Sequence, residues 1–216
     1  MLEQEIKSDI EERQRLMLQI KTLYLRYEFN EKDEELFLTY SIPAVYALWE
    51  GFVQTTFRTY IQQLNALMLT VDTVCEAILI HHIESKFPQF REYPTHTNKK
   101  MAFFGHLNAF YTSKSVEIRA DVNTESNVGF DVLNRLLRAF NLEPIQEYPL
   151  PRYSVARELT TLLRIRNAVA HGNHSVAVGR DYLNDAIKLV EILMDLVLES
   201  VLQGFSSKSY LKVQSE

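Results

Sequence analysis

The stretch YSIPAVYALWEGFVQTTFRTYIQQLNALML, residues 40–69, decides the fold class. Its apolar residues recur at three- and four-residue spacing over residues 45–64, which is the pattern of an α-helix with one wide buried face. Ser41 has a side chain that can cap a helix, and Pro43 is tolerated in a first turn, where its missing N–H costs nothing. We therefore predict a long buried helix that begins near Ser41 and ends near Leu69.

Helical patterns also occur before and after this stretch. A charged helix is expected over residues 2–29, with a loop at the charged residues 31–35. Pro88 and Pro94 are expected to bracket a loop, and residues 113–127 look irregular. Further helices are predicted over residues 72–87 (capped by Asp72 or Thr73), 99–113, 128–142 (capped by Ser126 or Asn127), 155–171 (capped by Ser154 and followed by Gly172) and 180–204 (ending at Gly204).

The sequence contains no convincing alternating strand and no internal repeat, and its six Gly and six Pro residues are few for a sheet-rich fold. We therefore predict an all-α helical bundle with an N-terminal helical extension. Residues 1–38 are expected to form a charged helix packed on the bundle or extending from it. Residues 39–204 are expected to form the helical domain, and residues 205–216 a polar tail.

The composition limits the class of protein. A formal net charge of −5 argues against a protein that coats nucleic acid without specificity, although residues 135–188 carry +3 and the rest of the chain −8. The single cysteine, Cys75, excludes an internal disulfide and a multi-cysteine metal site. No apolar run reaches the roughly 20 residues of a membrane span, and the charged N-terminus has no signal-peptide core. We expect a cytoplasmic protein that does not enter a membrane.

The second informative stretch is RIRNAVAHGNH, residues 164–174. Asn167 and His171 are four residues apart, so on a helix they share a face, and the amide can orient the imidazole. Histidine changes charge near neutral pH, as general acid–base catalysis requires, and the guanidinium of Arg166 has a fork that suits phosphate. Gly172 lets a bulky substrate approach the backbone. These residues suit a site that binds a phosphodiester and transfers protons there without a metal or other cofactor.

A plain helix end accounts for the same residues, because Arg or His followed by Gly is common at helix C-termini. A zinc site has less support. His171 and His174 are three residues apart, but no Asp, Glu or Cys nearby in the sequence completes a ligand set. His81 and His82 are adjacent and point in different directions on a helix.

With its context, RNAVAH resembles the R-x4-H signature of the HEPN superfamily, with Arg166 and His171 at its ends and Asn167 as the polar residue after the arginine. The resemblance extends over VYALWEGFVQ (residues 45–54), residues 122–142, LLRIRNAVAHG (residues 162–172) and the long apolar helix that follows. It looks like the MAE-like branch, which occurs in prokaryotic toxin–antitoxin and phage-defence loci.

The resemblance implies a metal-independent endoribonuclease. The ribose 2′-OH would attack the adjacent phosphate, leaving 2′,3′-cyclic phosphate ends. His171 would be the acid–base residue, Arg166 the phosphate clamp and Asn167 the orienting group, while Arg164, Asn173 and His174 are candidates for RNA contacts.

The family also implies a homodimer whose two motifs share one cleft. This fits the helix geometry, because residues five apart such as Arg166 and His171 lie about 140° apart on an ideal helix. An antitoxin or a defence-system protein is the expected partner besides RNA.

The alternative is a HEPN dimer without catalysis that binds RNA or a nucleotide, or that scaffolds a defence complex. Two further residues stand on the family-like helix. Trp49 is expected in the core rather than as a platform for bases. Glu50 is expected to pair with an arginine, either as part of the fold or at the site.

Overall fold

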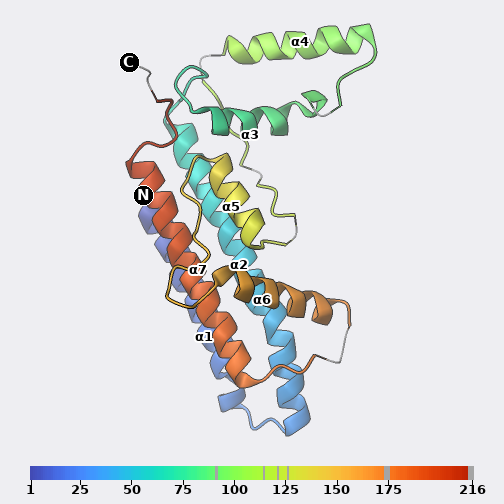
Figure 1. Cartoon of the computed structure of the whole chain (residues 1–216), viewed down its shortest axis with the longest axis vertical. Coiled ribbons are helices and arrows are strands. Elements are labelled where there is room, and N and C mark those ends of the chain that lie inside the picture. The colour runs from blue at the N-terminus through green and yellow to red at the C-terminus, as the bar shows by residue number, and fades with distance from the viewer. Residues whose placement is uncertain (91, 114, 121, 126, 173–175, 214–216) are drawn as a thin grey trace.

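The computed structural model describes residues 1–90, 92–113, 115–120, 122–125, 127–172 and 176–213 (Figure 1). This part of the chain forms an all-α fold, as predicted, without a strand among its residues. Its elements are α1 (Leu2–Arg26), α2 (Glu31–Ala66), α3 (Glu76–Lys86), the short 3-10 helix η1 (Pro88–Phe90), α4 (Thr97–Tyr111), α5 (Phe130–Ala139), α6 (Val155–Ala170) and α7 (Arg180–Ser206).

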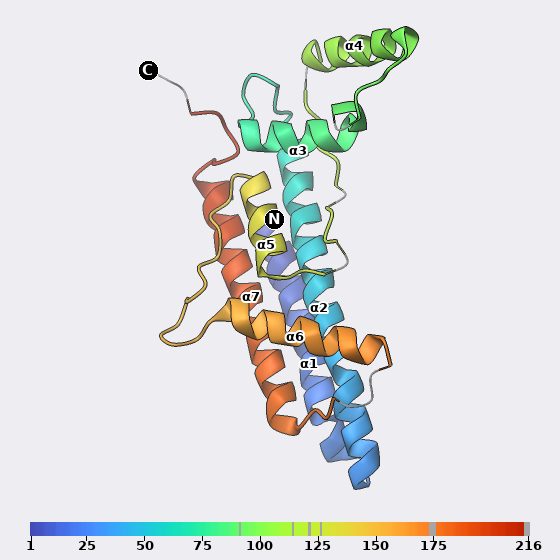
Figure 2. The same cartoon turned by 45° about the vertical axis from the view of Figure 1, so that its right-hand side comes forward.

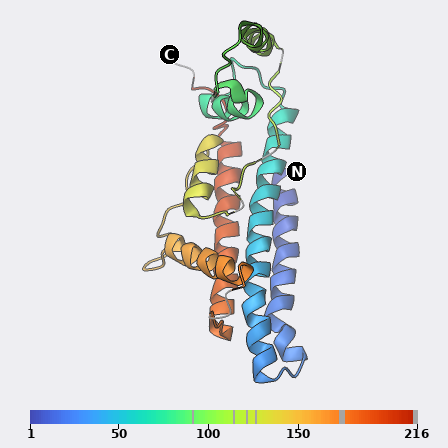
Figure 3. The same cartoon turned by 90° about the vertical axis from the view of Figure 1, so that its right-hand side faces the viewer.

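Three long helices, α1, α2 and α7, lie side by side and form the body of the molecule (Figure 1). The shorter helix α6 crosses α2 and α7, and α5 lies next to it on the same side, while α1 covers the opposite side (Figures 2 and 3). α3 and α4 lie together at one end of the body, far from the end where α1 turns into α2 (Figure 1). The fold therefore has two separate regions outside the body, one at α6 and one at α3 and α4.

The start of α2 differs from the prediction. The helix begins at Glu31, and Asn30 caps it by accepting hydrogen bonds from the N–H groups of Lys32 and Asp33. The charged residues predicted as a loop are its first turn, where carboxylates interact well with the positive end of the helix dipole. Ser41 is no cap, because its hydroxyl donates to the Phe37 carbonyl inside the helix at 2.8 Å.

Pro43 also lies inside α2 rather than in a first turn. Proline removes one backbone donor from the ladder, a cost that usually stops a helix. Here the helix continues because its buried face packs on α1, α6 and α7. Packing therefore overrides the local signal that misplaced the start of the helix.

Other helix ends were also misplaced. α3 begins after Cys75 rather than after Asp72 or Thr73, because the preceding segment pairs with the C-terminal tail, with the Cys75 N–H donating to the Tyr210 carbonyl. α5 is shorter than predicted and follows Gly129; Asn127 does not cap it, and Ser126 lies outside the described residues.

Gly204 does not end α7, which continues to Ser206. A Cβ on Gly204 would lie 2.2 Å from Cδ2 of Leu142, so this glycine permits a close approach of the chain to the helix. The predictions for α6 are confirmed: Ser154 accepts the N–H of Arg157, and Gly172 has a φ of +73° after the end of the helix.

The predicted domain boundary at residues 38 and 39 falls inside α2, and the tail after α7 is partly buried at Tyr210. The division into three parts stays a prediction. α1 packs on α2 and α7, and the guanidinium of Arg13 donates to Asp9 and to the Leu48 carbonyl of α2. Apolar packing and the hydrogen bonds of Arg13 thus help to hold the N-terminal helix on the body.

By length and composition alone, α2 could cross a membrane, and among the described residues no other helix passes that test. The buried central helix of a bundle has the same composition, and the core of this fold is built around α2. The cytoplasmic location stays a prediction.

Candidate functional site

The side chain of Arg166 points from α6 toward α2 and is only 24% exposed. Its Nη1 donates to Oδ1 of Asn167 at 2.8 Å and to Oδ1 of Asn127 at 3.3 Å. Its Nη2 lies 3.9 Å from Oε2 of Glu50 on α2. Side chains from α2, from the segment before α5 and from α6 itself thus hold one guanidinium in place.

Glu50 is itself held from the other side. Its Oε1 accepts from the Thr124 hydroxyl at 3.0 Å, and that hydroxyl accepts from Nε2 of Gln54 at 3.2 Å. The carboxylate is only 18% exposed, so its pairing with Arg166 is screened less than a surface ion pair. The expectation that Glu50 pairs with an arginine is confirmed.

An aromatic ring completes the surroundings of Arg166. The guanidinium carbon lies 4.5 Å from the ring centre of Tyr46, a cation–π distance. The Tyr46 hydroxyl accepts the N–H of Val128 at 2.7 Å. Burial, with a smaller contribution from the Glu50 carboxylate, raises the pKa of Tyr46 to about 12, so its phenol stays protonated at neutral pH.

His171 lies at the other end of the motif, where α6 stops. It is the C-cap residue, its backbone N–H donates to the Asn167 carbonyl at 3.0 Å, and its side chain is exposed. Asn167 contacts Arg166 through its side chain, and among the described residues no hydrogen bond joins that side chain to the imidazole. The structure thus brings Asn167 to the arginine and leaves the histidine facing solvent.

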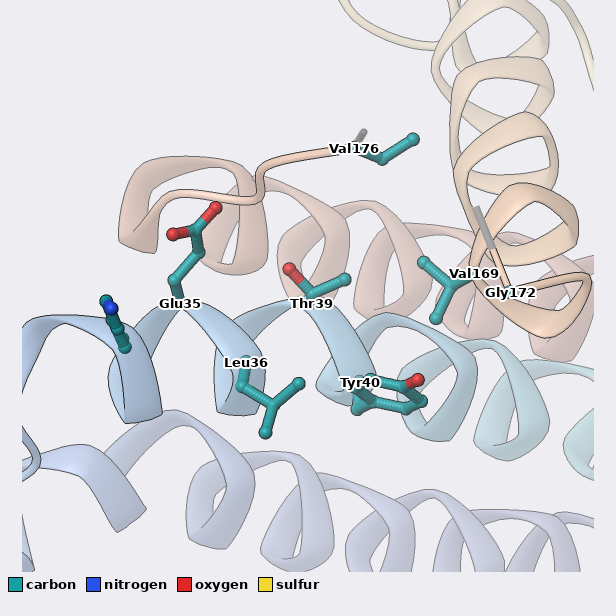
Figure 4. A pocket seen from close by; sticks show the side chains of 8 residues that line it. Glu35, Leu36, Thr39, Tyr40, Val169, Gly172 and Val176 are labelled. Atoms are coloured by element: carbon teal, nitrogen blue, oxygen red, sulfur yellow. The ribbon is translucent and has the colours of Figure 1, made fainter. Parts of the chain in front are cut away.

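A pocket of about 210 Å³ lies beside the end of α6 (Figure 4). Val169 and Gly172 form one wall, and the first half of α2 forms the other, with Glu35, Thr39 and Tyr40. Val176 approaches from the segment that leads to α7 (Figure 4). The pocket therefore adjoins His171, although this residue does not line it.

The start of α7 is anchored on α1 and α2. Arg180, the first residue of α7, forms a hydrogen-bonded ion pair with Glu34 of α2, and its guanidinium lies 4.5 Å from the ring centre of Tyr24 on α1. These contacts fix the position of the N-terminal end of α7.

Of the other residues predicted for the site, the structure describes only Arg164, which does not join this cluster. Arg164 is exposed on another face of α6. Burial raises the pKa of the nearby Tyr182 to about 12, and the positive charge of Arg164 opposes this rise. Asn173 and His174 lie outside the described residues. The Trp49 prediction is confirmed, because its side chain is fully buried and Nε1 donates to the Val128 carbonyl at 3.0 Å.

Among the described residues, no group of three or more His, Cys, Asp or Glu side chains could hold a metal ion. Cys75 is buried, and burial raises the pKa of its thiol.

Sequence reasoning missed Tyr46 and Asn127 as partners of Arg166. Tyr46 and Glu50 are four residues apart on α2, so a polar pair on an otherwise apolar face was a readable signal. Asn127 gave no such signal, because it lies 39 residues before Arg166 and its position depends on how the irregular segment before α5 folds back.

A family model described as RiboL-PSP-HEPN matches residues 7–203 of this chain. The chain therefore belongs to the RiboL-PSP-HEPN family and to the HEPN superfamily. The MAE-like branch suggested by the sequence is not shown by this match and stays a prediction. No curated protein and no solved structure matches the chain.

Membership of this family indicates a nuclease or an RNA-binding role. The family match begins within α1 and ends within α7, so it covers both the Arg166 cluster and the region of α3 and α4.

Proposed function

We propose that the protein is a metal-independent endoribonuclease whose reaction takes place at the end of α6. The observation that carries this proposal is the arrangement of Arg166 and His171 at the two ends of the last turns of α6. The arginine is held and partly buried, and the histidine is exposed beside a pocket. A fixed cation and an accessible acid–base group are what cleavage of a phosphodiester by its own 2′-hydroxyl requires.

In the proposed reaction, the 2′-oxygen attacks the adjacent phosphorus and loses its proton to a base. The bond from phosphorus to the 5′-oxygen breaks, and that oxygen takes up a proton. The products are a 2′,3′-cyclic phosphate and a 5′-hydroxyl, and no water is consumed. His171 transfers a proton, and Arg166 stabilises the charge that accumulates on the phosphate oxygens.

The proposal includes a homodimer that joins two copies of the motif. Within one chain, Arg166 is directed toward α2 and His171 faces solvent. In a two-fold dimer, the arginine and histidine side chains of both copies can line one shared cleft. The pocket beside His171 is bordered by Leu36 and Tyr40, which are 57% and 51% exposed. Such a large exposed apolar pair on one helix is suited to an interface.

The dimer is tested by measuring mass in solution with light scattering, for the wild type and for a Leu36→Glu/Tyr40→Glu variant. We expect a dimeric, active wild type and a monomeric variant with little cleavage. A control variant, Leu18→Glu, changes an exposed leucine of α1 and is expected to remain dimeric. A wild-type monomer that cleaves RNA at full rate would contradict this part of the proposal.

A role without catalysis has one observation in its favour. The pairing of Arg166 with Glu50 offsets part of its positive charge, as expected for an arginine that only stabilises the fold. In that case the protein binds RNA or a nucleotide, or holds an assembly together.

The two functions are separated by incubating the protein with total cellular RNA in EDTA and analysing the fragment ends. We expect cleavage that leaves 2′,3′-cyclic phosphates, and a loss of about 100-fold or more in His171→Ala. His96→Ala serves as the control, because His96 is also exposed and its side chain does not cap α4. RNA that stays intact with every variant would favour the non-catalytic role, and cleavage only with added metal would refute the proposed mechanism.

The proposal also includes a partner protein, either an antitoxin or a defence-system protein, that holds the ribonuclease in check. It further includes a cytoplasmic site of action. They rest on the resemblance to HEPN proteins of such loci.

A further inference from the structure

A second pocket, of about 540 Å³, lies between α3 and α4. We call it the α3–α4 pocket. Its volume is in the range of sites that hold a small molecule or a mononucleotide. The described residues that line it are His82, Lys86, Phe87, Gln89, His106, Ala109, Phe110, Ser113, Ser115 and Glu117.

Two of these side chains bury polar atoms without a hydrogen-bond partner among the described residues. The side chain of His82 is 1% exposed, and neither of its ring nitrogens is paired. Oε1 of Gln89 is also buried and unpaired. Because an unsatisfied buried polar group costs about 1–3 kcal/mol, two of them beside one pocket indicate that a ligand supplies the missing partners.

The imidazole of His82 has the hydrogen-bonding capacity of the neutral ring. Burial, followed by the charges of Lys86, His81 and Arg119, lowers the pKa of His82 to about 4. At neutral pH the ring therefore offers one N–H donor and one nitrogen acceptor. Together with the amide oxygen of Gln89, it can bind a ligand that carries both donors and acceptors.

Aromatic rings form much of the rest of the pocket. The His82 ring stacks on Phe110 at a centroid distance of 5.3 Å and an interplanar angle of 29°, and Phe87 contacts Phe110 edge to face at 6.0 Å. Beyond the pocket, Phe104 and Tyr111 of α4 are more than half exposed. Flat aromatic walls combined with hydrogen-bonding groups suit a planar heteroaromatic ring.

One lysine lies against these rings. The Lys86 ammonium lies 5.5 Å from the ring centre of Phe110, and His106 and the exposed Glu117 also line the pocket. Residues 84–119 hold six basic and three acidic residues, a formal charge of +3 in a chain of −5. Basic groups interleaved with aromatic rings are typical of proteins that bind single-stranded nucleic acid.

From these observations we propose that the α3–α4 pocket binds a nucleobase of the single-stranded RNA substrate. The inference rests on the proposed function, because it assigns the pocket to the RNA that is cut at α6. His82 and Gln89 hydrogen-bond the edge of the base, the rings of Phe87 and Phe110 cover its face, and Lys86 attracts the neighbouring phosphate.

The two sites are separated by a distance that a strand can span. Glu50 contacts Arg166 in the middle of α2, and the pocket is attached beyond the end of α2, where the Val116 N–H donates to the Leu69 carbonyl. This length of helix corresponds to about 25 Å, and the length from Tyr40, which lines the pocket beside His171, to the end of α2 corresponds to about 40 Å. About seven to twelve stacked nucleotides cover these lengths, so an oligonucleotide of twelve can reach both sites.

The test measures binding of 2′-O-methyl oligonucleotides of twelve nucleotides by fluorescence anisotropy in EDTA. These probes keep the bases and phosphates but lack the 2′-hydroxyl that the proposed cleavage needs. The variants are His82→Phe and Gln89→Leu. His82→Phe keeps a ring of similar shape and loses no hydrogen bond present in the structure, so folding is expected to be preserved. His81→Phe is the matched control on the same helix, because His81 does not line this pocket.

We expect His82→Phe and Gln89→Leu each to weaken binding about tenfold, and His81→Phe to leave it unchanged. Equal binding by all four proteins would overturn the inference. A second arm uses free AMP and UMP: if these bind in a His82-dependent way while the oligonucleotides do not, the pocket holds a free nucleotide and its assignment to the substrate is wrong.

Because the probes are not cleaved, this result is separate from catalysis. His82-dependent binding by a protein that never cuts RNA would refute the proposed function while retaining the base pocket. Cleavage that is unaffected by His82→Phe at low RNA concentration would refute the base pocket while retaining the proposed function.

Discussion

Two of the places where the described residues bury polar side chains differ in how those groups are satisfied. Around Arg166, the guanidinium, the Glu50 carboxylate and two asparagine side chains are paired with one another. In the α3–α4 pocket, both ring nitrogens of His82 and Oε1 of Gln89 have no partner among the described residues. The first arrangement is complete without a ligand and fixes a geometry, whereas the second gains hydrogen bonds only when something binds.

The largest effect is expected from changing the geometry at Arg166 while keeping its charge. Arg166→Lys replaces the planar fork with a single ammonium, which cannot reach Asn127, Asn167 and a phosphate together. We expect cleavage of RNA to fall by about 100-fold, as for the loss of a donor to the transition-state charge. Arg157→Lys, an exposed arginine near the start of α6, is the control and is expected to cleave normally. Equal activity of both variants would show that the paired cluster only supports the fold.

The second prediction concerns the stability of the same cluster. Arg166→Ala leaves the Glu50 carboxylate mostly buried without its cation, so the free energy of unfolding is expected to fall by about 1–3 kcal/mol in urea titrations. Adding Glu50→Gln removes the unpaired charge and is expected to recover part of this loss. A double variant whose loss of stability equals the sum of the two single losses would mean that Glu50 and Arg166 are not coupled.

The stability of the α3–α4 pocket is expected to depend on pH through His82. The pKa of His82 is lowered from its ordinary value of 6.5 to about 4 by burial, so between these values the unfolded chain binds a proton that the folded protein does not. The contribution of His82 to the free energy of unfolding is therefore fully present above pH 6.5 and is lost as the pH falls toward 4.

We therefore expect the stability difference between His82→Phe and wild type to grow by on the order of 2 kcal/mol from pH 7 to pH 4, in favour of the variant. Thermal unfolding followed by circular dichroism at several pH values measures this. The same measurement on His81→Phe shows how the loss of the neighbouring histidine changes stability, because burial also lowers the pKa of His81. Parallel curves for wild type and His82→Phe would contradict the assignment of a neutral, buried imidazole.

The smallest effect is expected at two glycines, one in each region. Gly172 follows α6 with a φ of +73° and open space around it, so Gly172→Ala costs only backbone strain, about 1 kcal/mol. Gly105 lies inside α4, also with open space, so Gly105→Ala is expected to stabilise by about 0.5–1 kcal/mol. Urea unfolding of the two variants checks both signs, and a stabilised Gly172→Ala would contradict the conformation at the end of α6.

Much of the fold was readable from the sequence because helical periodicity and local caps are local signals. The apolar stripe of α2 and the Ser154 cap of α6 were predicted correctly. The errors arose where distant contacts decide: Pro43 lies inside α2 because three helices pack on it, and Gly204 lies inside α7 because Leu142 approaches closely.

The site was predictable to a similar extent. The order of residues in α6 pointed to Arg166 and His171, but the spacing also suggested that Asn167 orients the imidazole, and its side chain contacts Arg166 instead. The α3–α4 pocket could not be predicted, since adjacent histidines such as His81 and His82 give no indication of which one becomes buried beside a cavity.

In the proposed reaction, the motif on α6 uses the RNA 2′-hydroxyl as its nucleophile. The most direct measurement uses a DNA oligonucleotide with one ribonucleotide, and a matched oligonucleotide with a 2′-O-methyl group at that position, both in EDTA. We expect a single cut after the ribonucleotide with a 2′,3′-cyclic phosphate end, no cut in the 2′-O-methyl substrate, and no cut by His171→Ala. Cleavage of the 2′-O-methyl substrate, or cleavage by His171→Ala at the wild-type rate, would contradict it.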